Sequence, residues 1–533
     1  MTPLADWFSP TSFYHHYLQG APTATSLFPA DYRQPDQVTR LFRQLEAFDS
    51  SIRNRMADEL LHQYGNQVTE QVTRSILALR KPNSLVIATG QQAGFFGGPL
   101  LTLLKTLSAK KWADQLTESH PEFEFIPVFW VEAEDHDFRE IALYRQPMQP
   151  PFTTDPTGPA YLSAGDRPIP ESWNEKLQEL TALLNGFPNG PETLALIAQH
   201  YQTGTTFGQA FAGLMRDLLA PLGILVLNPS TPECKRLGLP VFESEILSRK
   251  SGVFVQESTE TLTGAGFQQQ IQFKQVNLFW KSDTGRHRLD FRDGVFYPAG
   301  LEETLSPEEL ILQGRDQPER YSPGVILRSL WQSTLFPVAA VITGPAETTY
   351  WAQFPCLFAH AGVPFPLVIP RASGVVLEPA IQRLLGKNQL SFSRDLAGAG
   401  WVKEILLSGQ PALPDEEWFY SKLDSVFGDL SGSIQSIDPT LADSWNQALS
   451  RSRHLAGQVF EKVQKAALRR DETRFQQLTR IRENLFPDGQ LQERSISWIY
   501  FVAQVGRTFP NQIAGQLTTN PVFHLFSTHP SFG

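Results

Sequence analysis

The chain has 533 residues, a formal net charge of −10, 41% hydrophobic residues and 19% charged residues. A chain of this length is too long for a single hydrophobic core, which indicates several domains. The composition is that of a globular protein and not of a disordered one. The acidic balance argues against a nucleic-acid or anionic-membrane partner, and no apolar run approaches the roughly 20 residues of a membrane span.

The two cysteines, Cys234 and Cys356, lie far apart in the sequence. They support neither a disulfide framework nor a cysteine zinc site. The first residues lack the basic and then apolar pattern of a signal peptide. A reducing compartment fits these observations, and we expect a cytoplasmic protein.

The first two thirds of the chain have the pattern of an open α/β sheet. Helical spacing of apolar residues over 35–79 predicts an N-terminal helical layer within residues 1–80. Strands separated by helices follow, and the expected strands are 84–88, 125–131, 223–227, 338–342 and 364–369. This alternation is typical of parallel βαβ units. The expected core has three parts, 81–145, 205–239 and 322–375, separated by connecting insertions at 146–204 and 240–321.

The last third has the pattern of a helical arm, which we place at 376–495, followed by a C-terminal segment at 496–533. Asp438-Pro439 is a good helix start, and apolar spacing continues to Leu485 before a stop at Pro487. One helix of this length would span about 70 Å at 1.5 Å per residue. A helix this long needs partners, so we expect it to pack as a coiled coil on residues 416–437.

Three expected strands end in polar or glycine-rich segments, and open parallel sheets bind ligands beyond those ends. The first segment joins a strand to a helix; its glycines allow close backbone approach, and its free amides favour an anion. Its candidate binding residues are Gly90, Gln91, Gln92, Gly97, Gly98, Pro99, Thr102 and Lys105. The motif is neither GxGxxG nor a P-loop, because the Gly-Lys-Thr ending is missing. The alternative interpretation is a tight turn with packing glycines.

The second segment, Glu134, Asp135, His136 and Asp137, is the densest cluster of titratable groups. Adjacent carboxylates raise one another's pKa, which makes one of them a candidate base near neutrality, and a carboxylate there could also hold a substrate ammonium. One histidine with two aspartates is a poor set of ligands for a transition metal, while Mg²⁺ stays open. The alternative is a solvated acidic turn that caps the next helix.

The third segment contains Gly344 and Glu347 at the start of another expected helix. Glu347 falls in the first turn, which the helix dipole favours for structural reasons alone. Upstream, Arg328 and Gln332 lie four residues apart on one helical face, and Arg328 could clamp a carboxylate. Arg371 follows the fifth expected strand at the same rim of the sheet. We expect these residues to bind substrate.

Taken together, these segments resemble the bacillithiol synthase family of cysteine-adding ligases. The resemblance rests on TGQQAGFFGGP with TLLK after it, PVFWVEAEDHDFREI, YSPGVILR, LFPVAAVITGPAETTYWAQ, VIPRASG and LFPDGQLQER. The matches occur in order over most of the chain, with a compatible WFSP near the N-terminus. The resemblance implies a Rossmann-like core related to class I aminoacyl-tRNA synthetases and nucleotidylyltransferases. It also implies two inserted connecting regions and a C-terminal helical coiled-coil domain in a homodimer.

The reaction implied by the resemblance joins L-cysteine, through its carboxyl group, to the amine of glucosaminyl malate and gives bacillithiol. A free carboxylate must be activated for this, so ATP or another nucleotide is expected, and no metal site is evident. The HIGH motif of the synthetases is absent, which leaves adenylation, an acyl phosphate and another activated donor all open. Two further classes stay open: another class I-like nucleotidylyltransferase or amino-acid-activating ligase, and a noncatalytic nucleotide-binding scaffold.

Overall fold

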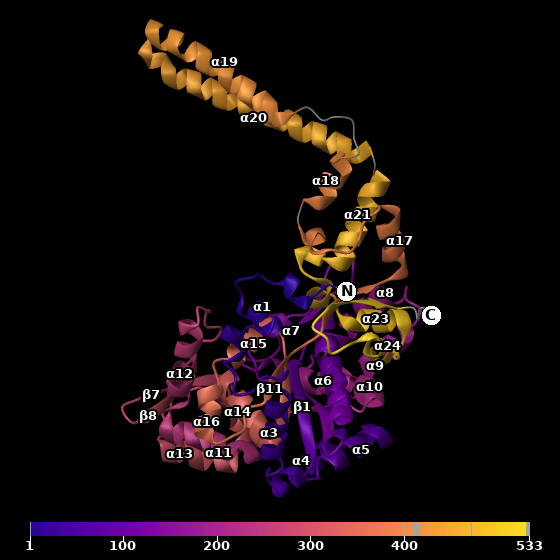
Figure 1. The fold of residues 1–533 in the computed structure, drawn as a ribbon, viewed down its shortest axis with the longest axis vertical. Helices are drawn as coiled ribbons and strands as arrows, with labels where there is room; N and C mark the ends of the chain where they lie inside the picture. Colours follow the sequence, from indigo (N-terminus) through magenta and orange to yellow (C-terminus); the bar gives the residue numbers. More distant parts are fainter. Residues whose placement is uncertain (1, 399, 409–414, 471, 529–533) are drawn as a thin grey trace. The chain divides into compact units, whose positions relative to one another are not determined.

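The computed structural model describes residues 2–398, 400–408, 415–470 and 472–528. The chain divides into two compact units, of which the first comprises residues 1–377 and 492–533 and the second residues 378–491. Figure 1 shows the helices and strands of each unit.

The first unit is built around a five-stranded sheet in which every pairing is parallel. Its strands are β1 (Ser84–Gln92), β2 (Glu124–Glu132), β5 (Leu225–Leu227), β10 (Val338–Thr343) and β11 (Leu367–Pro370). They lie in the order β11-β10-β1-β2-β5. The sheet therefore grows from β1 in one direction and later in the other, which creates a topological switch point between β1 and β10. The predicted Rossmann-like parallel core is confirmed.

Alternate residues of β1 enter different hydrophobic clusters, as expected for a strand covered on both faces. Leu85 and Ile87 pack with α3 (Pro35–Leu45) and α6 (Leu100–Ser119). Val86 packs on the other face, with residues of the helices α4 (Ser50–Tyr64), α5 (Glu70–Ala78), α11 (Pro232–Ser248) and α14 (Val325–Leu335). Helices on both faces leave the carboxyl edge of the sheet as the place where a cavity can open.

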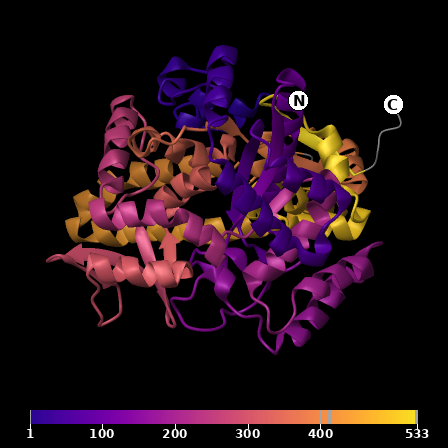
Figure 2. The ribbon, with the colours of Figure 1, turned by 90° about the horizontal axis from the view of Figure 1, so that it is seen from below.

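The helices of the two insertions lie on opposite sides of the sheet (Figures 1 and 2). The first contains the short strands β3 (Leu143–Tyr144) and β4 (Phe152–Thr153) and the helices α8 (Trp173–Leu184) and α9 (Gly190–His200). After it, α10 (Phe207–Leu219) begins with a capping box between Thr206 and Gln209.

The second insertion contains α12 (Ser251–Gly264), α13 (Pro307–Asp316) and an antiparallel sheet in the order β8-β7-β6-β9. Its strands are β6 (Leu278–Ser282), β7 (Gly285–Arg292), β8 (Val295–Pro298) and β9 (Tyr321–Pro323). Asp293 and Gly294 form the two-residue turn between β7 and β8, both with positive φ, as type I′ hairpins require.

The second unit is helical and contains a long hairpin. Its helices are α17 (Pro379–Lys387), α18 (Trp401–Ser408), α19 (Glu416–Ile437), α20 (Ala442–Arg470) and α21 (Glu472–Leu485). Asp438 accepts a hydrogen bond from the Thr440 amide at the turn between α19 and α20. The rings of Phe427 and Trp445 then stack at 4.5 Å across the two helices. The predicted packing of this arm on residues 416–437 is confirmed, while Asp471, inside the expected single helix, lies outside the described residues.

The end of the chain returns to the first unit. There β13 (Phe523–Ser527) pairs in parallel with β12 (Ser373–Leu377). The helices α23 (Trp498–Val505) and α24 (Phe509–Gln516) contribute to the hydrophobic cluster that also contains residues of α6. This return places residues 494–497 at the carboxyl edge of the central sheet.

Candidate active site

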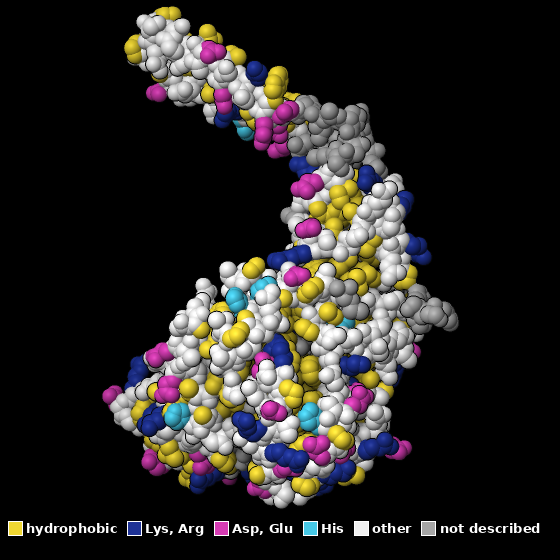
Figure 3. Space-filling model, in the orientation of Figure 1, with side chains coloured by type: hydrophobic (Ala, Val, Ile, Leu, Met, Phe, Trp, Pro, Cys, Tyr) yellow, Lys and Arg dark blue, Asp and Glu magenta, His cyan; other side chains and the backbone are white. Residues whose placement is uncertain are grey.

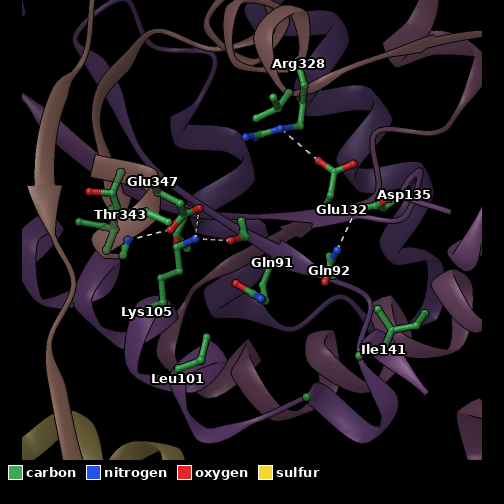
Figure 4. Close-up of a pocket in the computed structure, with 18 of the residues that line it drawn as sticks. Gln91, Gln92, Leu101, Lys105, Glu132, Asp135, Ile141, Arg328, Thr343 and Glu347 are labelled. Atoms are coloured by element: carbon green, nitrogen blue, oxygen red, sulfur yellow. Dashed lines mark hydrogen bonds and ion pairs between the residues drawn. The ribbon is translucent and has the colours of Figure 1, made fainter. Parts of the chain in front are cut away.

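A cavity of about 760 Å³ lies at the carboxyl ends of β1, β2, β10 and β11 (Figure 4). It occupies the switch point, where open parallel sheets bind their ligands. Most of the residues singled out in the sequence line it: Gly90, Gln91, Gln92, Gly98, Pro99, Lys105, Asp135, His136, Arg328, Gln332, Gly344, Glu347 and Arg371. Gly97, Thr102, Glu134 and Asp137 are not part of the lining.

The glycine-rich segment is more regular than the sequence suggests. β1 continues through Gln92, which pairs with Glu132 of β2, so the loop expected from Thr89 is wrong for its first four residues. The turn itself follows: Gly97 has φ 93°, and a Cβ there would overlap the indole of Trp498, which donates a hydrogen bond of 2.9 Å to the Gly97 carbonyl. Gly97 is therefore a packing glycine, while Gly98 faces the cavity.

Lys105 is buried beneath the cavity and carries two hydrogen bonds. Its Nζ lies 2.6 Å from the Gly90 carbonyl and 2.6 Å from Glu347 Oε1 (Figure 4). The other Glu347 oxygen accepts the Gly344 amide at 2.7 Å and caps α15 (Pro345–Trp351). Burial lowers the pKa of Lys105 despite the contact with Glu347. The pair ties α6 to the end of β10, and the anion contact expected of Lys105 stays a prediction, since Glu347 already balances its charge.

Arg328 forms an ion pair with Glu132, a carboxylate for which the sequence predicted no role. Its Nε lies 3.2 Å from Glu132 Oε2, and its Nη2 lies 3.4 Å from the Tyr350 hydroxyl. Burial raises the pKa of Glu132, although Arg328 opposes the shift. The available signal was position: Glu132 is the last residue of β2, at the cavity edge, and a carboxyl there with a raised pKa is a candidate base.

Glu134 has a structural environment instead of a catalytic one. It is only 4% exposed, and its carboxylate contacts Lys235 at 2.7 Å and Lys281 at 3.0 Å. Burial would raise the pKa of Glu134, but the two lysines outweigh it and lower the pKa to about 2. The expectation of a raised pKa is wrong for this residue, because ammonium groups from distant segments surround it.

The rest of the acidic segment forms a turn at the rim of the cavity. Asp135 accepts the His136 amide at 2.6 Å and a hydrogen bond of 2.9 Å from Gln92 Nε2. His136 is exposed, with its Nδ1 3.3 Å from Asp135. Asp137 is exposed and outside the lining. Asp135 and His136 thus remain in contact with the cavity, and the catalytic role proposed for Asp137 stays a prediction without a position in the site.

Further cationic groups complete the lining. Arg371 Nη2 donates to the buried Glu493 at 2.7 Å, so the anion contact expected of Arg371 competes with an existing ion pair. Arg494, exposed at the rim, and Arg286, from β7, were not singled out in the sequence. Arg286 lies in an insertion far from the strand-end segments, so no local pattern marks it.

Within the residues described, no group of three or more His, Cys, Asp or Glu side chains is placed to hold a metal ion. In the same residues, no helix has the length and apolar character that crossing a membrane requires.

Comparison with known proteins gives a consistent result over both units. Residues 4–372 match the N-terminal Rossmann-like domain of the bacillithiol biosynthesis protein BshC, and residues 374–525 match its C-terminal coiled-coil domain. A relative from Salinibacter ruber is 31% identical over 93% of this chain and 92% of its own length. Relatives from Chlorobaculum tepidum and Koribacter versatilis are each 30% identical, over 91% and 97% of this chain and 90% and 98% of their own lengths. All three bear the name "Putative cysteine ligase BshC".

Proposed function

The chain belongs to the BshC family of bacillithiol biosynthesis, and we propose that it forms the amide bond between the carboxyl group of L-cysteine and the amine of glucosaminyl malate. The product of this reaction is bacillithiol. The observation that carries the proposal is the cavity at the switch point of the sheet, in which a carboxyl of raised pKa, Glu132, lies among arginines.

The charges of the cavity fit these substrates. Glucosaminyl malate carries two carboxylates and one amine, and cysteine carries one carboxylate and one amine. The cationic side chains of the lining are Lys105, Arg286, Arg328, Arg371 and Arg494, and the carboxylates are Glu132, Asp135 and Glu347. Cations thus exceed carboxylates by two (5 − 3) in a chain of net charge −10. Guanidinium groups match carboxylates in geometry, so this local excess favours anionic substrates.

Glu132 supports the proton transfer that the reaction needs. The attacking amine must lose its proton as the carbon–nitrogen bond forms, and a base works best when its pKa lies near the operating pH. Burial moves the pKa of Glu132 in that direction, whereas the pKa of Glu134 moves away from it. We therefore assign the proton-accepting role to Glu132, in place of Glu134 and Asp137.

ATP or another nucleotide is the activating group that we propose. The backbone at Gly98 lies in the lining beside the N-terminus of α6, and its φ of 77°, together with the 3.1 Å approach of a Cβ to Thr102 Oγ1, favours glycine at this position. Arg494 lies in the same lining and is exposed. These groups fit an anionic phosphate, which would turn the cysteine carboxyl oxygen into a leaving group.

The test is formation of bacillithiol. Purified protein is supplied with glucosaminyl malate, L-cysteine and ATP, each omitted in turn, and the products are followed by mass spectrometry. A strain lacking the gene should lose bacillithiol and regain it with the wild-type gene. Retention of bacillithiol in that strain would contradict the proposal. An amide formed with another amine or amino acid would instead support a different ligase of the same fold.

A further inference from the structure

Arg286 differs from the other cations in the interior of the cavity, because no carboxylate of the described residues forms an ion pair with it. The others each have one: Lys105 contacts Glu347, Arg328 contacts Glu132 and Arg371 contacts Glu493. Burial lowers the pKa of Arg286, with more distant carboxylates opposing the shift. A partly buried guanidinium without a counterion carries a desolvation cost that a bound anion would offset.

The Arg286 side chain is nevertheless held in one place. Its Nε donates to Ser322 Oγ at 2.7 Å, its Nη2 donates to the Pro323 carbonyl at 3.3 Å, and its guanidinium carbon lies 3.5 Å from the centre of the Phe279 ring. None of the described contacts uses Nη1. The two terminal nitrogens therefore retain N–H groups for a ligand, in the fork geometry that suits a carboxylate.

Ser322 connects Arg286 to Glu134. The Ser322 hydroxyl donates to Glu134 Oε2 at 3.0 Å while it accepts from Arg286 Nε. Glu134 is fixed in turn by Lys235 and Lys281. The negative charge of Glu134 thus orients the Ser322 hydroxyl so that its lone pair faces Arg286. In this way Glu134, which does not line the cavity, fixes a side chain that does.

The backbone of Arg286 is fixed by the other insertion. Its amide donates to the Tyr161 carbonyl at 2.8 Å, and Gly285, at φ 130°, lies so close to Tyr161 that a Cβ would overlap it. Lys281 also bonds to Asp166 of the first insertion at 2.8 Å. Both insertions therefore meet at the residue that brings this guanidinium to the cavity.

We propose that Arg286 binds a carboxylate of the acceptor substrate, and that Ser322 and Glu134 are positioning residues which hold its guanidinium in the cavity. The inference rests on the proposed function only for the choice of a carboxylate as the anion. Arg286 is the binding residue because it faces the cavity and has free N–H groups. Ser322 and Glu134 act through it, since neither lies in the lining.

The test is a calorimetric titration of the full chain with L-malate as the probe and inorganic phosphate as a second probe. Arg286→Lys keeps the charge and loses Nε and the fork. Ser322→Ala removes the hydrogen bond to Nε. Ser230→Ala is the matched control, because Ser230 also donates to Glu134, at 3.4 Å, and has no contact with Arg286. Melting temperatures establish that each variant is folded.

We expect Ser322→Ala and Arg286→Lys to weaken malate binding by about 10- to 100-fold, the range for loss of a hydrogen bond to a charged group. Ser230→Ala should bind malate as the wild type does. The double variant with Arg286→Lys and Ser322→Ala should bind malate no more weakly than Arg286→Lys alone, because Ser322 acts only through Nε of Arg286. If the losses of binding free energy of the two single variants added up in the double variant, Ser322 would have a structural role of its own. The proposal that Ser322 positions Arg286 would then be overturned.

Two further outcomes would overturn the assignment of Arg286 itself. One is a wild type that does not bind malate at millimolar concentration. The other is phosphate binding that depends on Arg286 while malate binding does not, which would make the site a phosphate site. The titration does not involve turnover. Arg286-dependent malate binding in a protein that forms no bacillithiol would therefore support this inference and contradict the proposed function.

Discussion

Glu132 and Glu134 lie two positions apart at the end of β2, and their pKa values shift in opposite directions. Burial acts on both, but Glu132 has one guanidinium beside it and Glu134 has two ammonium groups. Environments that separate the pKa values of neighbouring carboxyls typically separate their roles. Glu132 is therefore suited to proton transfer and Glu134 to permanent negative charge.

Glu132→Gln should lower turnover by about 10²- to 10⁴-fold, the usual contribution of a positioned base, with little change in melting temperature. In the wild type, turnover should rise as the pH passes upward through the raised pKa of Glu132, and the variant should lack this limb of the profile. Steady-state kinetics across pH measure both effects.

Glu124→Gln is the matched control for Glu132→Gln, since Glu124 begins the same strand and pairs with Lys81 away from the cavity. Normal turnover in Glu132→Gln would remove this residue from the mechanism. The same assay on Asp137→Asn tests the assignment made from the sequence.

Glu134→Gln should destabilise the fold by about 3–5 kcal/mol at neutral pH, because the buried Lys235 loses its carboxylate partner, whereas Lys281 keeps Asp166. The folded pKa of about 2 lies below the ordinary value of 4.5. The stabilisation is therefore fully present above pH 4.5 and is lost as the pH falls towards 2. Chemical denaturation of both proteins at several pH values measures this. A difference that stayed constant between pH 7 and pH 3 would contradict the ion-pair explanation.

For single residues, the sequence predicted which types of side chain lie at the carboxyl edge of the sheet. It did not predict which side chains form ion pairs with one another. Lys235 and Lys281 follow Glu134 by 101 and 147 positions (235 − 134 and 281 − 134) and reach it only through the fold. A local pattern of carboxylates suggested mutual repulsion, whereas the dominant charges came from elsewhere in the chain. Arg286 escaped attention for the same reason.

The turn between β1 and α6 needs glycine for two different reasons, close packing at one position and exposure to the cavity at the next. Gly97 needs a positive φ and leaves no room for a Cβ beside Trp498, whereas Gly98, also at positive φ, faces the cavity. The sequence offered a ligand-binding loop and a packing turn as alternatives, and neighbouring glycines of one segment meet both. Spacing along the chain could not separate them, because Trp498 lies 401 positions away.

Gly97→Ala should lower stability by about 2–5 kcal/mol, from backbone strain together with overpacking against Trp498. Thermal unfolding measures the loss. Gly186→Ala is the control, since a Cβ at that exposed position meets nothing within 4 Å. If both variants melted with the wild type, the close packing of Gly97 on Trp498 would not be important for stability.

The bounds of a strand were predictable where a continuous apolar run covers the whole strand. They were less predictable where the strand continues into polar residues. The runs at 125–131 and 338–342 agree with β2 and β10 to within one residue at each end. β1 extends four residues beyond its apolar run, since pairing with β2 continues through Gln92. Backbone pairing across a sheet does not require apolar side chains, so the sequence ended this strand too early.

At the scale of the whole molecule, the order of strands decides where the site lies. The sequence predicts parallel strands, since each strand is apolar throughout and is followed by a helix. It does not state that β10 pairs with β1 on the side opposite β2, which creates the switch point. That pairing unites segments near residues 90, 132, 344 and 371 in one cavity, to which the insertions and the C-terminal return add Arg286 and Arg494.

The hairpin of α19 and α20 leaves large apolar side chains uncovered in the single chain (Figure 3), and we expect a second copy of the chain to cover them. Leu455 and Val459, one turn apart on α20, are 62% and 58% exposed. Leu455→Glu with Val459→Glu should give a folded monomer, because both positions already contact water within one chain. Light scattering at micromolar concentration measures the mass.

Asn446→Glu with Ser450→Glu adds the same charge at exposed positions, and Asn446 lies half a turn around the helix from Leu455, at roughly 100° per residue. This control should remain dimeric. A monomeric wild type would contradict the prediction, and a monomeric control would attribute dissociation to charge instead of to the apolar side chains.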